Sequence, residues 1–130
     1  MSSIFSKIVS NEIPSYKVYE NENFLAFLDI NPLKQGHTLV IPKIEVDYIF
    51  DLKSKEYQEL WNFAKLVAKG MKRVIKCERI SIVVMGLEVP HAHIHLIPID
   101  SMQDIDFSQP KLNLSTDQMN KIASLINSAI

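Results

Sequence analysis

The chain has 130 residues, of which 47% are hydrophobic and 22% are charged, and these values are typical of one globular domain with a buried core. Its formal net charge of −1 and its lack of a basic tract argue against a dedicated nucleic-acid-binding protein. The apolar stretches are far shorter than the ~20 residues that span a bilayer, no secretory signal is visible, and the single cysteine excludes an internal disulfide. We therefore expect a cytoplasmic protein that makes no membrane contact.

Short strands dominate the first part of the chain. A helical turn at residues 4–9 is expected to end before Ile13-Pro14, because the residue before a proline disfavours helix. Three strand candidates follow, separated by polar, proline and glycine residues typical of turns. They cover residues 16–19, 24–30 and 37–41.

A long helix and two further strands are expected next. Apolar residues at three- and four-residue spacing predict a helix from about Ser54, its expected N-cap, to Lys76. Strands are predicted at residues 80–85 and 91–99, on either side of a tight connection. A capping box beginning at Ser115 predicts a last helix. Its expected apolar face comprises Met119, Ile122, Leu125 and Ile126.

These elements predict an α+β domain with a mostly antiparallel sheet, one long helix and a C-terminal helix. Strands lie before and after the long helix and are mostly joined by short loops. No repeat or linker interrupts the chain, so residues 1–130 are expected to form a single domain.

Three of the four histidines alternate with apolar residues. Residues i, i+2 and i+4 of a strand share one face, so His91, His93 and His95 are expected to line one side of the last strand. The alternating residues Ala92, Ile94 and Leu96 then face a core. Three desolvated imidazoles on one face are costly unless another interaction offsets them, which favours a functional site over decoration of the surface.

Two kinds of chemistry suit such a face. Neutral imidazole is a common zinc ligand, and a closed zinc site needs about four ligands. Alternatively, one imidazole acts as a nucleophile in phosphoryl or nucleotidyl transfer, while the others carry protons or bind phosphate. The triad alone leaves both alternatives open.

The segment from residue 91 to residue 97 resembles the motif of the histidine triad (HIT) family, His-φ-His-φ-His-φ-φ with φ apolar. Residues 25–32 and 36–43, and residues 4–8 with 12–14, also resemble the family in order and spacing. The resemblance covers residues 4–99 and implies a HIT-like fold. Residues 100–130 form a C-terminal extension, which we interpret as a helix that closes the core or a dimer seam.

The resemblance implies a Hint- or Fhit-like nucleotide hydrolase or transferase. Such proteins cleave purine nucleotide conjugates, such as phosphoramidates or dinucleoside polyphosphates, at the α-phosphate through a nucleotidyl-histidine intermediate. His93 matches the nucleophile, and His37 matches a histidine that orients the triad. His91 and His95 match the flanking positions that contact phosphate and assist the leaving group. An imidazole suits the nucleophile's role because its pKa near 6.5 leaves the free base abundant at neutral pH.

The same resemblance implies binding residues for the nucleoside. Asp29 matches an acid that holds the ribose hydroxyls, although an aspartate before Asn31-Pro32 can instead cap the loop. Four apolar residues match the pocket around the base, and simple core packing is the alternative for them. They are Phe5, Ile8, Ile13 and Phe27.

Two segments depart from the family pattern. Many members have polar phosphate-binding residues just before the triad, where this chain has a shorter loop with Glu88. Glu88 either points elsewhere or contacts the leaving group, for example a cationic amine. Some bacterial members bind zinc through two cysteines and an extra histidine, where this chain has Ser3, Ser6 and Glu45. We therefore expect no bound metal and no cofactor.

The family also implies a homodimer whose sheets join across a two-fold axis. Two other functions are kept as alternatives. One is a non-catalytic, nucleotide-binding regulatory protein, which the missing phosphate-side donors make reasonable. The other is a metal-dependent hydrolase in which the histidines are ligands.

Overall fold

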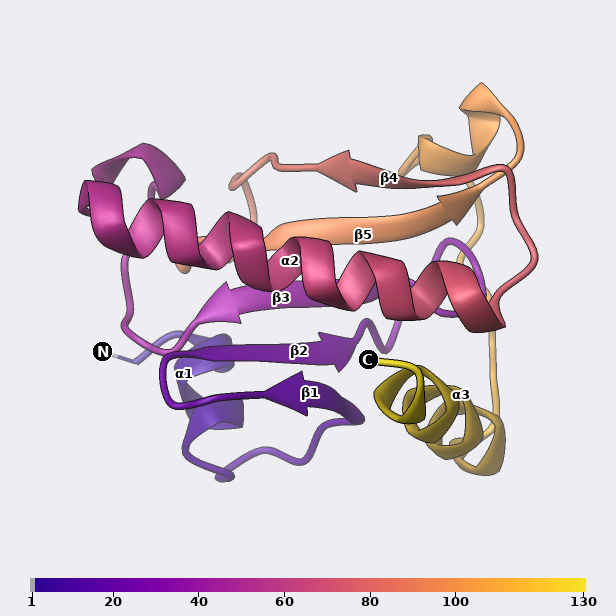
Figure 1. The fold of residues 1–130 in the computed structure, drawn as a ribbon, viewed down its shortest axis with the longest axis horizontal. Coiled ribbons are helices and arrows are strands. Elements are labelled where there is room, and N and C mark those ends of the chain that lie inside the picture. The colour runs from indigo at the N-terminus through magenta and orange to yellow at the C-terminus, as the bar shows by residue number, and fades with distance from the viewer. Residues whose placement is uncertain (1) are drawn as a thin grey trace.

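The computed structural model of the chain describes residues 2–130, which form one five-stranded antiparallel sheet with helices on both faces (Figure 1). The strand order is β1-β2-β3-β5-β4. The strands are β1 Lys17–Glu20, β2 Phe24–Leu28, β3 Thr38–Pro42, β4 Arg79–Val83 and β5 Ile94–Ile99. The α-helices are α1 Ile4–Val9, α2 Ser54–Val74 and α3 Thr116–Ser128, and two 3₁₀ turns are η1 Ile49–Asp51 and η2 Met102–Ile105. The prediction of an α+β domain with a mostly antiparallel sheet is confirmed.

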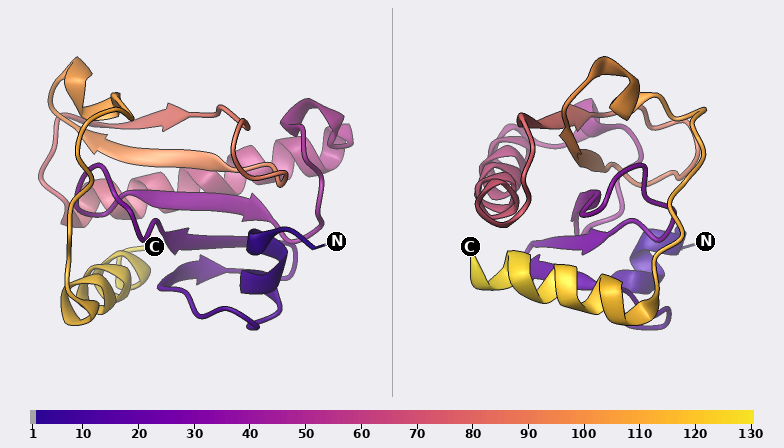
Figure 2. Two further views of the ribbon diagram at one scale, coloured as in Figure 1. Left: turned by 180° about the vertical axis from the view of Figure 1, so that it is seen from behind. Right: turned by 90° about the vertical axis from the view of Figure 1, so that its right-hand side faces the viewer.

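The two faces of the sheet are buried by different helices. Helix α2 crosses one face, and α1 lies on the opposite face, as the views in Figure 2 show. Side chains of β2 alternate accordingly, because successive strand residues point to opposite sides. Ala26 and Leu28 join the core under α2 and α3, whereas Leu25 and Phe27 pack with α1. All residues of β2 and β3 are buried, so the central strands read as continuous apolar runs.

Helix α2 begins at the expected residue but is capped differently. The residue in the N-cap position is Lys53, whose side chain makes no capping hydrogen bond, so the assignment of Ser54 as the N-cap is wrong. Ser54 is instead the first helical residue. The predicted apolar stripe does pack on the sheet, with Leu60, Val67 and Met71 fully buried. Burial of this stripe, rather than capping, therefore stabilises the start of α2.

Helix α3 has the predicted capping box, in which the Ser115 and Gln118 side chains bond reciprocally to backbone N–H groups. Its apolar face is narrower than predicted. Leu125 is 47% exposed, and Ala123 is buried in its place. A stripe with i, i+3, i+4 and i+7 spacing from Met119 reaches Ala123 but misses Leu125, which explains the difference.

The triad strand begins later than predicted. Strand β5 starts at Ile94, so His91 and His93 lie in the extended segment that leads into it. Ala92 in that segment donates its N–H to the Val46 carbonyl at 2.6 Å, beyond the end of the regular ladder. The alternation survives, because Ala92, Ile94 and Leu96 all belong to the core under α2. None of the helices in the described part of the chain is long and apolar enough to span a bilayer.

Candidate active site

A cavity of about 620 Å³ lies on the face of the sheet that carries α1. His93 and His95 line it, together with the binding residues expected from the sequence. Those residues are Phe5, Ile8, Ile13, Phe27, Asp29 and Glu88. Helix α1 and the C-terminal segment border this face on opposite sides (Figure 2). The fold therefore gathers residues from the whole length of the chain into one pocket.

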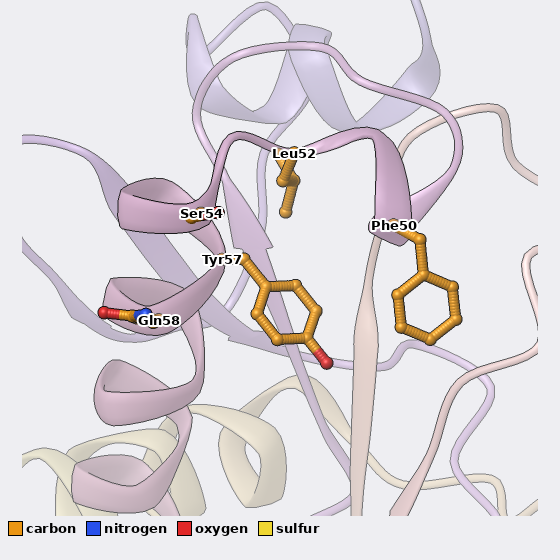
Figure 3. Close-up of a pocket in the computed structure, with 5 residues that line it drawn as sticks. All are labelled: Phe50, Leu52, Ser54, Tyr57 and Gln58. Atoms are coloured by element: carbon orange, nitrogen blue, oxygen red, sulfur yellow. The ribbon is translucent and has the colours of Figure 1, made fainter.

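A second hollow of about 220 Å³ lies between η1 and the first turns of α2. Figure 3 shows the five residues that line it, which are Phe50, Leu52, Ser54, Tyr57 and Gln58. These side chains include no imidazole, carboxylate or amine, and none of them lines the first cavity. The chemistry of the histidines therefore belongs to the larger cavity.

The position of the proton on His93 follows from one hydrogen bond. Its Nδ1 lies 2.7 Å from the carbonyl oxygen of His91, which can only accept. Nδ1 therefore carries the proton, and Nε2 keeps a free lone pair. The Phe5 ring packs edge-on against His93 with centroids 5.0 Å apart, and the imidazole is only 6% exposed. His93 thus presents an unprotonated nitrogen on a ring that is largely shielded by protein.

His37 and His95 form a directed chain of hydrogen bonds. The Leu33 N–H donates to His37 Nδ1 at 3.1 Å, so the proton of His37 lies on Nε2. That N–H donates to His95 Nδ1 at 3.0 Å, which leaves the proton of His95 on its own Nε2. Burial lowers the pKa of His37 to about 3 and that of His95 to about 4. Both rings are therefore neutral at neutral pH, and His95 offers an N–H donor.

His91 differs from the other two triad members because it does not line the cavity. Its ring is fully buried, and both nitrogens have partners within the protein. Nε2 lies 2.8 Å from the Pro42 carbonyl oxygen, and Nδ1 lies 2.8 Å from Ser3 Oγ. The sequence assigned His91 a phosphate contact, but in the structure it has no free nitrogen for one.

Asp29 caps its loop and also lines the cavity. Its Oδ1 accepts the Asn31 N–H at 2.9 Å, which caps the loop, while the residue also lines the cavity. Its Oδ2 lies 3.6 Å from His37 Nε2, and because that ring is neutral this pair is not a salt bridge. Burial raises the pKa of Asp29, so a hydrogen-bonding ligand would replace hydration that the carboxyl has lost.

The four apolar residues pack in a core cluster and also line the cavity. Phe5, Ile8 and Phe27 belong to a buried cluster between α1 and the sheet, and Ile13 packs at its edge. The Phe5 and Phe27 rings meet edge to face with centroids 5.5 Å apart. Because the same side chains line the cavity, their packing fixes the shape of its apolar wall. Glu88 also lines the cavity and is exposed.

The C-terminal segment contributes two residues to this site that the sequence did not predict, because residues 100–130 were interpreted as a packing extension. The Phe107 ring lies edge-on to His95, with centroids 5.0 Å apart, and 6.1 Å from the centroid of His37. Lys111 also lines the cavity, and its Nζ lies 5.9 Å from the Phe107 centroid and donates to the Phe107 carbonyl. The C-terminal segment therefore covers His37 and His95.

The residues present do not suit a bound metal ion. Ligand atoms of Asp29, His37 and His95 lie within 4.8 Å of one another. However, the Leu33 hydrogen bond puts the proton of His37 on Nε2, the nitrogen that faces this group. At the positions of the family's zinc ligands, Ser3 and Ser6 offer hydroxyls, which are not among the side chains that usually bind zinc.

Comparisons with known proteins converge on one family. The HIT domain model matches residues 10–102. An uncharacterized HIT-like protein of Borreliella burgdorferi is 36% identical over an alignment of 132 positions, which covers 95% of each chain. The adenosine 5'-monophosphoramidase HNT1 of Saccharomyces cerevisiae is 34% identical over 121 residues, covering 92% of this chain and 77% of the yeast protein.

The fold also matches solved structures. A Hit-like protein involved in cell-cycle regulation from Bartonella henselae superimposes with a TM-score of 0.87 and is 29% identical. The match covers 99% of this chain and 96% of the Bartonella chain, so it includes α3 and the segment that carries Phe107.

Proposed function

Because this chain belongs to the HIT domain family, we propose that it hydrolyses purine nucleotide conjugates at the α-phosphate. Membership of the family, together with the name of the yeast relative, supports nucleotide hydrolase activity in general. The proposal adds the substrate class, adenosine phosphoramidates or dinucleoside polyphosphates, and a nucleotidyl-histidine intermediate. The single observation that carries it is the free Nε2 of His93 in the cavity.

In the proposed reaction, His93 Nε2 attacks the α-phosphorus and forms a P–N bond. The bond to the leaving group breaks, and the leaving group departs with the electron pair and takes up a proton. Water then attacks the phosphorus, releases the nucleotide and restores the imidazole. The Nδ1–H bond to the His91 carbonyl supports this cycle, because it holds the ring still and stabilises the positive charge that develops on it.

His95 is proposed to act as a hydrogen-bond donor. Its neutral Nε2–H can donate to a phosphoryl oxygen or to the leaving atom, while His37 fixes its tautomer from behind. The low pKa of His95, which results mainly from burial, keeps the ring from being protonated before the substrate arrives. A fixed donor in a desolvated site stabilises developing charge more than the same donor in water.

The nucleoside is proposed to occupy the apolar side of the cavity. The apolar wall formed by Phe5 and Phe27 suits a purine ring packed against it, and Asp29 lines the same cavity, where a carboxylate can accept from two ribose hydroxyls. Burial has already removed part of the hydration of Asp29, so these hydrogen bonds replace water rather than compete with it.

The direct test compares wild type with His93→Ala on an adenosine phosphoramidate and a diadenosine polyphosphate. We expect the variant to lose cleavage of both while still binding AMP, which calorimetry would measure. Mass spectrometry of quenched wild-type reactions should show a nucleotidyl adduct on His93. If AMP binds but neither conjugate is cleaved, the function as a non-catalytic nucleotide-binding protein would be supported instead.

We also propose a homodimer, formed through the edge of the sheet at β4. Ile82 on this strand is 52% exposed, and Met85 and Leu87 just after it are 46% and 89% exposed. An unpaired edge strand with apolar side chains is a ready surface for a second copy of the chain. Light scattering of wild type and Ile82→Lys should give dimer and monomer masses, whereas a wild-type monomer would contradict the proposal.

A further inference from the structure

Four polar residues from three segments meet behind the cavity. Ser3 and Ser6 belong to the start of α1, Glu45 follows β3, and His91 opens the triad. Ser3 Oγ lies 2.8 Å from His91 Nδ1. Glu45 Oε1 accepts two hydrogen bonds, from the Ser3 N–H at 2.5 Å and from Ser6 Oγ at 2.7 Å. We call this set the Ser-Ser-Glu clasp on His91.

The direction of each hydrogen bond in the clasp is determined. His91 Nε2 must donate to the Pro42 carbonyl oxygen, so Nδ1 is an acceptor and Ser3 Oγ donates to it. Ser3 Oγ in turn accepts the Ser6 N–H at 3.0 Å, as the N-cap of α1. The Ser6 hydroxyl donates a hydrogen bond to Glu45, so it cannot also donate to His91 Nδ1, and Ser3 is the donor to that nitrogen. Every donor has one acceptor, so the arrangement admits one tautomer of His91.

The clasp is connected to His93 in two ways, through the His91 carbonyl and through Phe5. The carbonyl of His91 is the acceptor that keeps the proton of His93 on Nδ1, so a fixed His91 fixes the nucleophile. Phe5 lies between the two clasp serines on α1 and packs edge-on against His93. Displacement of the N-terminal turn of α1 would therefore weaken the hydrogen bond that holds the proton of His93 on Nδ1. It would also disturb the packing of Phe5 against the His93 ring.

We propose that Ser3, Ser6 and Glu45 are positioning residues that orient His93 through His91 without a metal ion. The proposal rests on the function proposed above, because it assigns these residues to the nucleophile of that reaction. It also accounts for the departure from the family's zinc ligands. Two hydroxyls and a carboxylate do not supply zinc's preferred thiolates, but they do supply the donors and acceptors that hold His91 and α1 together.

Glu45 has the properties that this role needs. Although the residue is exposed, hydrogen bonds from the Ser3 N–H and then the Ser6 hydroxyl lower its pKa to about 2. It is therefore ionised throughout the neutral range and accepts both hydrogen bonds. The adjacent Val46 carbonyl accepts the Ala92 N–H, so the segment after β3 is bound to the triad segment by backbone as well.

The test compares Ser3→Ala and Glu45→Ala with Ser10→Ala and Glu12→Ala. The control pair also forms a Ser–Glu hydrogen bond, of 3.2 Å, but at the other end of α1 and away from the histidines. Nitrogen-15 NMR of the ring nitrogens at pH 7.5 reports the tautomers of His91 and His93, and steady-state kinetics reports kcat and KM. A merely structural role would lower thermal stability without changing the ring-nitrogen shifts or kcat of the folded protein.

We expect Ser3→Ala to shift the His91 Nδ1 resonance, because this nitrogen loses its hydrogen-bond donor while Nε2–H still donates to the Pro42 carbonyl. The variant should also lower kcat about tenfold, with a smaller change in KM. Ser3→Thr, which keeps the hydroxyl, should restore both. Glu45→Ala should lower kcat relative to Glu12→Ala, and its exposed position makes it the informative variant if Ser3→Ala does not fold.

Unchanged ring-nitrogen shifts together with control-level kcat in Ser3→Ala and Glu45→Ala would overturn the proposal. If wild type cleaves neither conjugate, the proposed hydrolase function fails, but the NMR comparison still decides whether the clasp fixes His91 and His93.

Discussion

The buried imidazoles His37 and His95 should make the stability of this protein fall steeply between pH 7.5 and pH 5.0. In the unfolded chain each ring takes up a proton near the ordinary pKa of about 6.5. In the folded protein burial lowers the pKa to about 3 for His37 and about 4 for His95. Over this range the unfolded state binds more protons than the folded state, so acid favours unfolding.

The magnitude follows from these values. At pH 7.5 neither state binds an appreciable proton at these two rings. At pH 5.0 the unfolded rings are protonated and the folded rings are not, which costs about 2 kcal/mol for each ring and about 4 kcal/mol together. The carboxyls with a lowered pKa, such as Glu20 and Glu45, bind few protons in either state above pH 5.0 and affect this interval much less. Burial raises the pKa of Asp29, which acts in the opposite direction and offsets part of the loss. Burial also lowers the pKa of His91, which adds to the loss in the same direction.

Urea unfolding followed by Trp61 fluorescence at several pH values would measure the effect. The free energy of unfolding should fall by about 4 kcal/mol from pH 7.5 to pH 5.0, and by about 2 kcal/mol in His37→Gln, which lacks one of the rings. The comparison within each variant removes any uniform destabilisation caused by the substitution. A wild-type loss below about 1 kcal/mol would show that these imidazoles are hydrated in the folded protein and would refute the reasoning.

Four further outcomes are expected. Phe107→Ala should raise the pKa of His95 toward its ordinary value, because burial is the main cause of the lowering; NMR titration measures this, with Phe50→Ala in the separate hollow as the control. Asp29→Asn should abolish any preference for AMP over 2′-deoxy-AMP in calorimetry, and a retained preference would contradict the ribose contact. Lys111→Gln should raise KM for a diadenosine polyphosphate more than for a phosphoramidate with a neutral amine, because only the former has an anionic leaving group near the ammonium; equal changes would argue against this. Metal analysis of purified protein should find well under one zinc per chain, and a chelator should leave cleavage unchanged, whereas stoichiometric zinc would contradict the analysis of the ligand set.

The parts of the fold that the sequence predicted are those with a local periodic pattern. The stripe of α2 and the capping box at Ser115 need only neighbouring residues to be recognised. The prediction that Leu125 is buried was wrong, because Leu125 lies off the stripe with i, i+3, i+4 and i+7 spacing from Met119, which includes the small residue Ala123 instead. The prediction that the last strand begins at His91 was wrong, because its pairing with β3 ends at Val40 and Ile94. The alternation of histidine and apolar residues continues before Ile94, so the sequence alone does not show where the pairing ends.

The site shows the same division. His93, His95 and Asp29 belong to segments with recognisable spacing, and the structure brings them to one cavity. Phe107 lies in a polar segment with no periodicity, so only the path of the chain reveals that it covers His95. The engagement of both nitrogens of His91 likewise depends on Ser3, a residue 88 positions away in the sequence.

The two walls of the cavity have a consequence for how the site assembles. One wall comes from α1 near the start of the chain, and the other comes from residues 107–111, which precede the last helix. Contacts between such distant segments close long loops and tend to form late in folding. We therefore expect a newly made chain to acquire its sheet, and the hydrogen bond between His37 and His95 within it, before it can hold a nucleotide.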